Sequence, residues 1–196
     1  MADIEALNES VMNTITDFFD EYSAVESVDY STRCSSLEPG TPVPAKGGVH
    51  ITENKQHIDA YGYQAGEKIK AMCDEQRSGI LDQMSVPPSD DALRMMQTIS
   101  LRGASVTETE LRALADKYGD NYQVRKFLAD QMKERKLGSI DEDPLDAQLK
   151  QIDHAQKVGE GNVKAYKLED KNAIGKPARL AMIKEQLYGT GIFSML

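Results

Sequence analysis

Three helix-start signals follow one another in the middle of the chain, and they constrain the fold more than any other feature of the sequence. Ser89 stands before two aspartates, Thr107 is followed three residues later by Glu110, and Asn121 begins the third run. Ser, Thr and Asn are favoured N-cap residues, and the Thr-x-x-Glu spacing is that of a capping box. A glycine, the commonest residue just past a helix end, follows each run, at Gly103, Gly119 and Gly138. Residues 86–138 are therefore predicted to form a compact three-helix module.

Apolar residues recur every three or four positions within each of these runs, which places them on one face of a helix. The predicted buried faces are Leu93, Met96 and Ile99 in the first helix, Leu111, Leu114 and Ala115 in the second, and Val124, Phe127, Leu128 and Met132 in the third. A module of this size can fold on its own when its core is tightly packed.

Residues 1–28 are predicted to form an N-terminal amphipathic helix, and residues 29–52 a Pro-, Gly- and Ser-rich linker. The helical stripe is Ile4, Leu7, Val11, Ile15, Phe18 and Tyr22. It has no obvious partner before the linker, so we expect it to meet the same helix of a second copy or a groove on another protein. Ile4, Leu7, Val11 and Phe18 are accordingly candidate partner-binding residues.

Residues 53–85 are predicted to form one long helix, through apolar positions that include Ile58, Ala65 and Ile69. Gly62 and Gly66 interrupt it, and each costs about 1 kcal/mol of helix stability relative to Ala. Because they are four residues apart, they lie on one face. That spacing permits a close approach of another helix, but it is equally consistent with a helix that begins later.

Residues 139–196 are predicted to contain a helix from Leu145 to Val158, a loop or isolated strand up to Pro177, a short helix from Ala178 to Leu187, and an apolar end. Residues 161–196 carry six basic and three acidic side chains, whereas residues 1–45 carry nine acidic side chains and one arginine. A basic segment with an apolar end suits an acidic protein surface that has a hydrophobic pocket. The candidate contact residues are Lys176, Arg179, Lys184 and Phe193. The alternative is that this segment folds back on the acidic N-terminal half.

No catalytic, cofactor-binding or metal-binding motif is present, so we expect no enzyme and no cofactor. His50, His57 and His154 lack the spacing of metal ligands, and surface positions are predicted for them. The sequence DEDPLD lacks the Gly and Glu of a calcium loop, and IGKPAR has Pro177 where a P-loop needs Ser or Thr. The remaining expectation is an all-α protein with flexible linkers that acts through binding.

The charge and hydropathy patterns narrow the class of partner. The net charge is −9, and residues 86–137 have no continuous basic face, so nucleic acid is an unfavoured partner. No run approaches 18 apolar residues and the start of the chain lacks the features of a signal peptide, so no membrane is expected. Cys34 and Cys73 form no disulfide framework, which agrees with a reducing cytoplasm.

One segment resembles a known group of sequences. Pro88 to Leu93, Leu101-Arg102, Val106 to Leu111 and Gly119 to Asn121 resemble a pattern in uncharacterised helical proteins of tailed phages and prophages of Gram-positive bacteria. The resemblance covers about 50 of the 196 residues. Those proteins belong to head-assembly gene clusters, and they bring no catalytic residues.

The resemblance implies a scaffold-like or capsid-associated role. The protein would be a structural or assembly component in head morphogenesis, in the host cytoplasm during assembly or in the virion. Its partners would be capsid or other phage structural proteins, or further copies of itself. Two alternatives stay open: a cytoplasmic adaptor that binds a host or phage protein, and a DNA-associated accessory factor.

Overall fold

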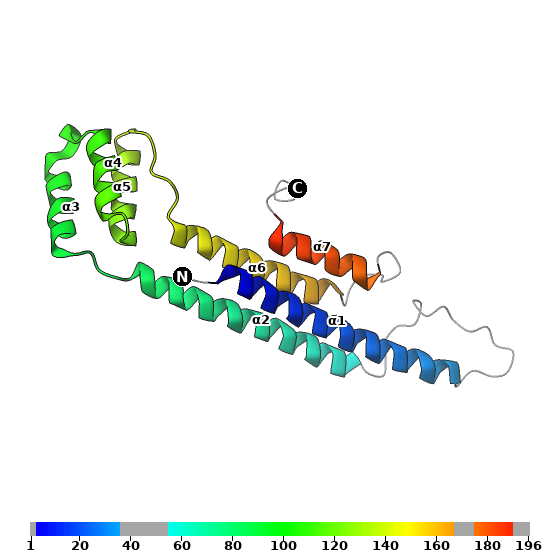
Figure 1. Cartoon of the computed structure of the whole chain (residues 1–196). Coiled ribbons are helices and arrows are strands. Elements are labelled where there is room, and N and C mark those ends of the chain that lie inside the picture. Colours follow the sequence, from blue (N-terminus) through cyan, green and yellow to red (C-terminus); the bar gives the residue numbers. More distant parts are fainter. Residues whose placement is uncertain (1–2, 36–54, 167–174, 190–196) are drawn as a thin grey trace. The chain divides into compact units, whose positions relative to one another are not determined.

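The fold is all-α, as predicted. The computed structural model describes residues 3–35, 55–166 and 175–189, and these residues form seven α-helices, one 3-10 turn and no strand (Figure 1). The helices are α1 (Ile4–Ser35), α2 (Lys55–Met84), α3 (Asp90–Arg102), α4 (Glu108–Tyr118), α5 (Tyr122–Glu134), α6 (Pro144–Tyr166) and α7 (Lys176–Tyr188).

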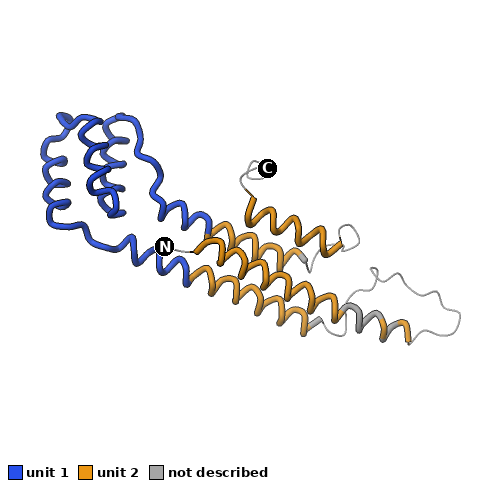
Figure 2. The backbone as a smooth tube through the Cα atoms, in the orientation of Figure 1, with its two compact units in different colours: residues 1–2, 75–151 blue, residues 3–74, 152–196 orange. Residues whose placement is uncertain are grey.

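The described residues divide into two compact units (Figure 2). Unit 1 contains Glu75–Gln151, which is the end of α2, all of α3, α4 and α5, and the start of α6. Unit 2 contains Asp3–Asp74 and Ile152–Leu196, which is α1, most of α2, most of α6, and α7.

The helix starts of unit 1 are formed by the predicted caps. The Ser89 hydroxyl accepts from the Ala92 N–H at 3.3 Å, and the Asn121 side chain accepts from the Val124 N–H at 3.2 Å. Thr107 and Glu110 form a complete capping box at the start of α4. Local side-chain chemistry therefore fixes where all three helices begin.

The core of unit 1 is built from one face of each helix. Its buried residues are Ala92, Ile99, Val106, Leu111, Val124, Leu128 and Met132, and partly buried residues such as Leu114, Ala115 and Phe127 pack against them. The prediction for α3 was wrong at one position. Leu93 is 42% exposed and Ala92 is buried instead, because the buried stripe of α3 follows the i, i+3, i+4, i+7 positions Ala92, Met95, Met96 and Ile99.

The ends of the three helices agree less well with the predicted glycines. Gly103 does follow α3 with a positive φ of 51°. At the end of α5 the left-handed residue is Lys136, with φ 57°, and the Leu137 N–H donates back to the Met132 carbonyl at 2.9 Å. The helix therefore ends in a Schellman-type turn two residues before Gly138.

Helix α1 is the centre of the core of unit 2. Val11, Ile15, Phe18 and Phe19 are fully buried, and Leu7 and Tyr22 are nearly so. The Phe18 ring stacks on the Tyr61 ring of α2, with their centroids 6.4 Å apart. The stripe has no partner before the linker, as the sequence indicated, but the rest of the chain supplies one, because α2, α6 and α7 contact it.

Helix α1 is also longer than predicted. It continues to Ser35, through the first seven residues of the predicted 29–52 linker. The sequence has no proline or glycine between the start of α1 and Pro39, so nothing in it interrupts the helical hydrogen bonds. The rest of the predicted linker lies outside the described residues.

Helix α6 continues into the segment that was predicted to be a loop or isolated strand. It reaches Tyr166 and includes both Gly159 and Gly161. A Cβ atom on Gly159 would lie 2.9 Å from Cγ1 of Val11 and 2.9 Å from Cγ2 of Ile69. Gly159 is therefore a point of close approach among α6, α1 and α2, where tertiary packing outweighs the low helix propensity of glycine.

This contact predicts opposite effects for two neighbouring glycines. We expect Gly159→Ala to destabilise the protein by about 1–3 kcal/mol, because the added methyl group overpacks two fully buried side chains. Gly161→Ala should stabilise it by up to about 1 kcal/mol through helix propensity alone, since a Cβ there meets no atom within 4 Å. Chemical denaturation of both variants measures the difference. Equal effects would show that α6 does not approach α1 and α2 at Gly159.

Candidate functional site

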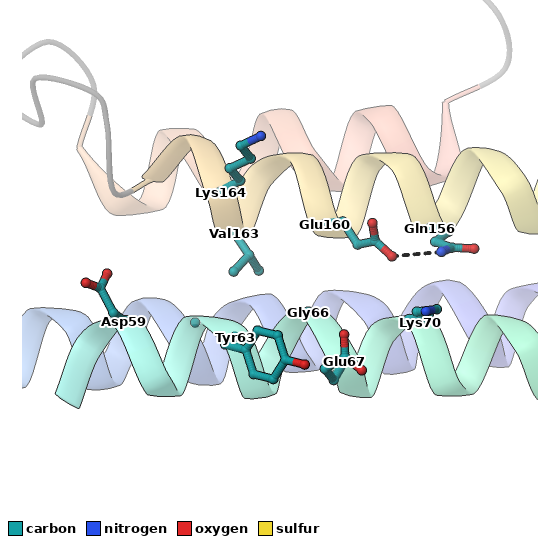
Figure 3. Close-up of a pocket in the computed structure, with 10 residues that line it drawn as sticks. Asp59, Tyr63, Gly66, Glu67, Lys70, Gln156, Glu160, Val163 and Lys164 are labelled. Carbon is teal, nitrogen blue, oxygen red and sulfur yellow. Dashed lines mark hydrogen bonds between the residues drawn. The ribbon is translucent and has the colours of Figure 1, made fainter. Parts of the chain in front are cut away.

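A groove between α2 and α6 is a candidate binding site. Its volume is about 600 Å³ (Figure 3). The lining residues are Asp59, Gly62, Tyr63, Gly66, Glu67 and Lys70 of α2, with Gln156, Glu160, Val163 and Lys164 of α6. They recur at spacings of three and four on each helix, so each set lies on one helix face. All of them belong to unit 2.

Two glycines of α2, Gly62 and Gly66, line the groove, so the α2 wall carries no side chain at these positions. A Cβ atom built on Gly66 would meet no other atom within 4 Å, so the space above it is open. The Gly62 position is buried. Opposite them, the Val163 side chain is 4% exposed and points from α6 toward α2 (Figure 3). The α2 backbone can therefore be approached closely by a helix that enters the groove.

The rim of the groove is polar and charged. It carries three carboxylates, two lysine side chains, one glutamine and one tyrosine. The Gln156 amide donates to Glu160 Oε1 at 2.7 Å, and Tyr63 is 68% exposed (Figure 3). An exposed tyrosine beside a mixed-charge rim is the kind of surface that recognises protein side chains.

The titratable side chains of the groove are carboxylates, lysines and one tyrosine. The groove contains no serine, cysteine or histidine to act as a nucleophile or base. Across the part of the chain that the structure describes, no group of three or more His, Cys, Asp and Glu residues could hold a metal ion.

The largest shift in pKa belongs to a structural carboxylate in unit 1. The Thr107 N–H and the Arg102 guanidinium donate to Glu110, and they lower the pKa of Glu110 from 4.5 to about 2. The causes are those of a helix cap, so the shift marks the start of α4 and not a reactive site.

The N-terminal residues predicted to bind a partner lie inside unit 2. Leu7, Val11 and Phe18 are buried, and Ile4 is partly buried. They form the chain's own core, so in this structure they are not available as a surface.

The basic residues predicted to bind a partner are on α7 and face different surroundings. Lys176 forms an ion pair with Asp20 of α1, Arg179 is partly buried, and Lys184 is exposed. Phe193 lies outside the described residues. Ile183 and Leu187 of α7 are buried in unit 2. The alternative that this segment folds back on the acidic N-terminal half describes α7 correctly.

The histidines in the described residues are exposed, as predicted, and each contacts another helix. His57 Nε2 of α2 lies 2.9 Å from Glu21 Oε1 of α1. His154 Nε2 of α6 donates to the Gln186 carbonyl of α7 at 2.8 Å. His50 lies outside the described residues.

Sequence reasoning found one side of the groove and missed the other. The Gly62–Gly66 spacing was equally consistent with a close helix approach and with a helix that begins later, and α2 begins at Lys55, before both glycines. The α6 side was missed, because Glu160, Val163 and Lys164 fell in the segment predicted to be a loop. The signal was present: Gln156, Glu160 and Val163 continue the helical spacing past Gly159.

Comparison of the chain with protein-family models, curated proteins and solved structures finds no match. Within the described residues, no helix combines the length and apolar character needed to cross a bilayer.

Proposed function

We propose that this chain is a non-enzymatic assembly protein that works through protein–protein contacts, and that the groove between α2 and α6 holds a helix of its partner. The groove itself carries the proposal. On its α2 side, glycine leaves the backbone without a side chain beside open space. Its rim carries charged side chains, and both of its helices contribute from the same unit.

A helix is the partner element that fits best. Gly66 leaves the α2 backbone without a side chain beside open space, so another helix can come close there, as small residues allow wherever helices pack tightly. Along the groove, Asp59 of α2 and Lys164 of α6 stand toward one end, and Lys70 and Gln156 stand toward the other, with the carboxylates of Glu67 and Glu160 between them (Figure 3). A partner helix with a basic side chain at its centre complements this order of charges.

The phage part of the proposal rests on the resemblance of residues 88–121. In that setting the protein is a component of head morphogenesis, and its partners are capsid or other structural proteins. It acts in the host cytoplasm during assembly and can remain in the virion. A cytoplasmic adaptor would use the same groove at one or a few copies per complex, so copy number separates these two functions.

The DNA-associated alternative has less support. The start of α5 holds the basic and aromatic side chains that a recognition helix would use. There the Tyr122 hydroxyl donates to Asp146, the Gln123 amide faces the Met84 and Ser85 carbonyls, and Arg125 donates to the Asp141 carbonyl. These side chains are engaged within unit 1.

Filling the groove tests the proposal. Gly66→Gln places a long polar side chain in the open space, while Gly161→Gln makes the same change at an open position of α6 outside the groove. Both variants should be at least as stable as the parent, because Gln is a better helix former than Gly. We expect Gly66→Gln to weaken association with particles or capsid protein roughly tenfold, which is about 1.4 kcal/mol, and Gly161→Gln to leave it unchanged.

The measurement is quantitative mass spectrometry of particles purified from cells that produce each variant. The copy number of the parent protein distinguishes a scaffold or virion component from an adaptor. Equal amounts of both variants in the particles would show that the groove is not the contact surface. Absence of the parent protein from particles and their precursors would remove the phage role.

A further inference from the structure

The charged side chains of the groove between α2 and α6 follow a fixed order along its length. Asp59 of α2 and Lys164 of α6 stand toward one end, where their opposite charges offset each other (Figure 3). Glu67 of α2 and Glu160 of α6 stand at the centre, so both charges there are negative (Figure 3). Lys70 stands toward the other end. From the first end to the second, the walls are therefore balanced, then negative, then positive.

The charges at the centre and at the positive end are not neutralised by the described part of the chain. Within that part, Glu67, Lys70 and Lys164 form no ion pair. Oε1 of Glu160 accepts a hydrogen bond from the uncharged Gln156 amide at 2.7 Å. A carboxylate has about four lone-pair sites, so Glu160 keeps acceptors for a further donor. The centre of the groove is therefore a place for a cation.

Helix geometry fixes the distance between the negative centre and the positive end. Glu67 and Lys70 are three residues apart in α2, so they are separated by about 4.5 Å along its axis. On an incoming helix, two side chains at this separation and on one face are three or four residues apart, which is one turn. The groove therefore matches a helix with a basic and an acidic side chain one turn apart.

The surface between the charged side chains favours small residues on the same face of that helix. A Cβ on Gly66 would meet open space, and Val163 opposite is buried. Alanine or glycine between the two charged side chains lets the backbone of the incoming helix approach α2. A large side chain at this place would hold the helix away, so its charged side chains would reach the walls less well.

We propose that the groove selects its partner helix by this order of charge. The basic side chain lies between Glu67 and Glu160, and the acidic side chain, one turn away, lies at Lys70. This inference rests on the proposed function, and it adds the sequence pattern of the partner. A helix with the two charges on opposite faces makes only one of these contacts, and an acidic side chain at the centre is repelled by both carboxylates.

Two alanine-rich helical peptides of about 20 residues serve as probes. Each contains one arginine and one glutamate, with glutamines elsewhere for solubility. In the first peptide the two charged residues are four positions apart and share a face, and in the second they are two positions apart and lie on opposite faces. Fluorescence anisotropy of the labelled peptides measures their binding to the full chain at low ionic strength. We expect the first peptide to bind roughly tenfold more tightly.

A charge exchange within the groove should remove this preference. Glu67→Lys combined with Lys70→Glu keeps the net charge and reverses the order of charge, and both positions are exposed, so the fold should be retained. The control is Asp153→Lys combined with Lys157→Asp, an exchange at two exposed positions of α6 outside the groove. The control should keep the preference, whereas the groove exchange should bring the two affinities to within about twofold of each other.

The Gly66→Gln variant separates failure of this inference from failure of the proposed function. If both peptides bind the parent equally and Gly66→Gln blocks both, the groove holds helices without selecting them by charge, and only this inference is overturned. A preference that survives the groove exchange has the same meaning. If neither peptide binds, or if Gly66→Gln leaves their binding unchanged, the groove is not a site for a helix, and the inference and the proposed role of the groove are both overturned.

Discussion

Phe18→Ala should lower the free energy of unfolding of unit 2 by about 3–5 kcal/mol. The ring is fully buried, stacks on Tyr61 of α2, and meets the Tyr22 ring edge-on at 6.3 Å. Removing it leaves a cavity among α1 and its neighbours that the remaining helices fill only in part. Denaturant-induced unfolding, followed by circular dichroism, measures the loss.

Tyr63→Ala is the matched control for this prediction. It removes an aromatic side chain of α2 that is 68% exposed, so the free energy of unfolding should change by less than about 0.5 kcal/mol. The comparison decides between two roles of α1. If α1 were a free helix that waits for a partner, Phe18→Ala would alter self-association and leave the stability of the monomer unchanged.

The parts of the fold that depend on local chemistry were predictable from the sequence. Ser89, Thr107 and Asn121 each cap the helix that was predicted to follow, because the cap bonds join residues only three positions apart. The three helix faces of unit 1 followed from apolar spacing. The error at Leu93 arose because Ala92 lies beside it, and sequence spacing favoured the larger apolar residue for burial.

The parts that depend on contacts between distant segments were not predictable. The Gly159 position looks like a helix breaker until Val11 and Ile69 are placed against it, more than 80 residues away in sequence. The α1 stripe looked unpartnered because its covering helices follow the undescribed segment 36–54 or come from the far end of the chain. The groove was hard to predict for both reasons. Its two helices are far apart in the sequence, and most of its α6 residues follow Gly159, where the glycines indicated a loop or strand.

Helix α1 contacts the three other helices of unit 2. Phe18 stacks on Tyr61 of α2, Val11 lies against α6 at Gly159, and Asn8 donates to α7. Phe18 and Val11 are seven residues apart, so one side of α1 is covered by both α2 and α6. The described part of this stripe is therefore buried within the chain, and the groove between α2 and α6 is a surface that unit 2 offers to a partner.

Leu111→Ala should destabilise unit 1 by about 2–5 kcal/mol, through the same loss of buried volume. Leu111 is fully buried in the cluster that α3, α4 and α5 form, where it packs with Val124, Leu128 and Met132. Phe127→Ala should cost less than Leu111→Ala, because Phe127 is only partly buried. Leu101→Ala is the control, since Leu101 is 88% exposed and its removal should change stability by less than about 0.5 kcal/mol.

Hydrogen exchange locates the effect of Leu111→Ala. Because the cluster around Leu111 lies entirely within unit 1, amides of α3, α4 and α5 should exchange faster in this variant while those of α1 keep their parental rates. Phe18→Ala should give the reverse pattern. Each unit would then unfold on its own, so unit 1 can be altered without disturbing the groove between α2 and α6. Acceleration of α1 and α4 to the same extent in both variants would show instead that the two cores unfold as one cooperative body.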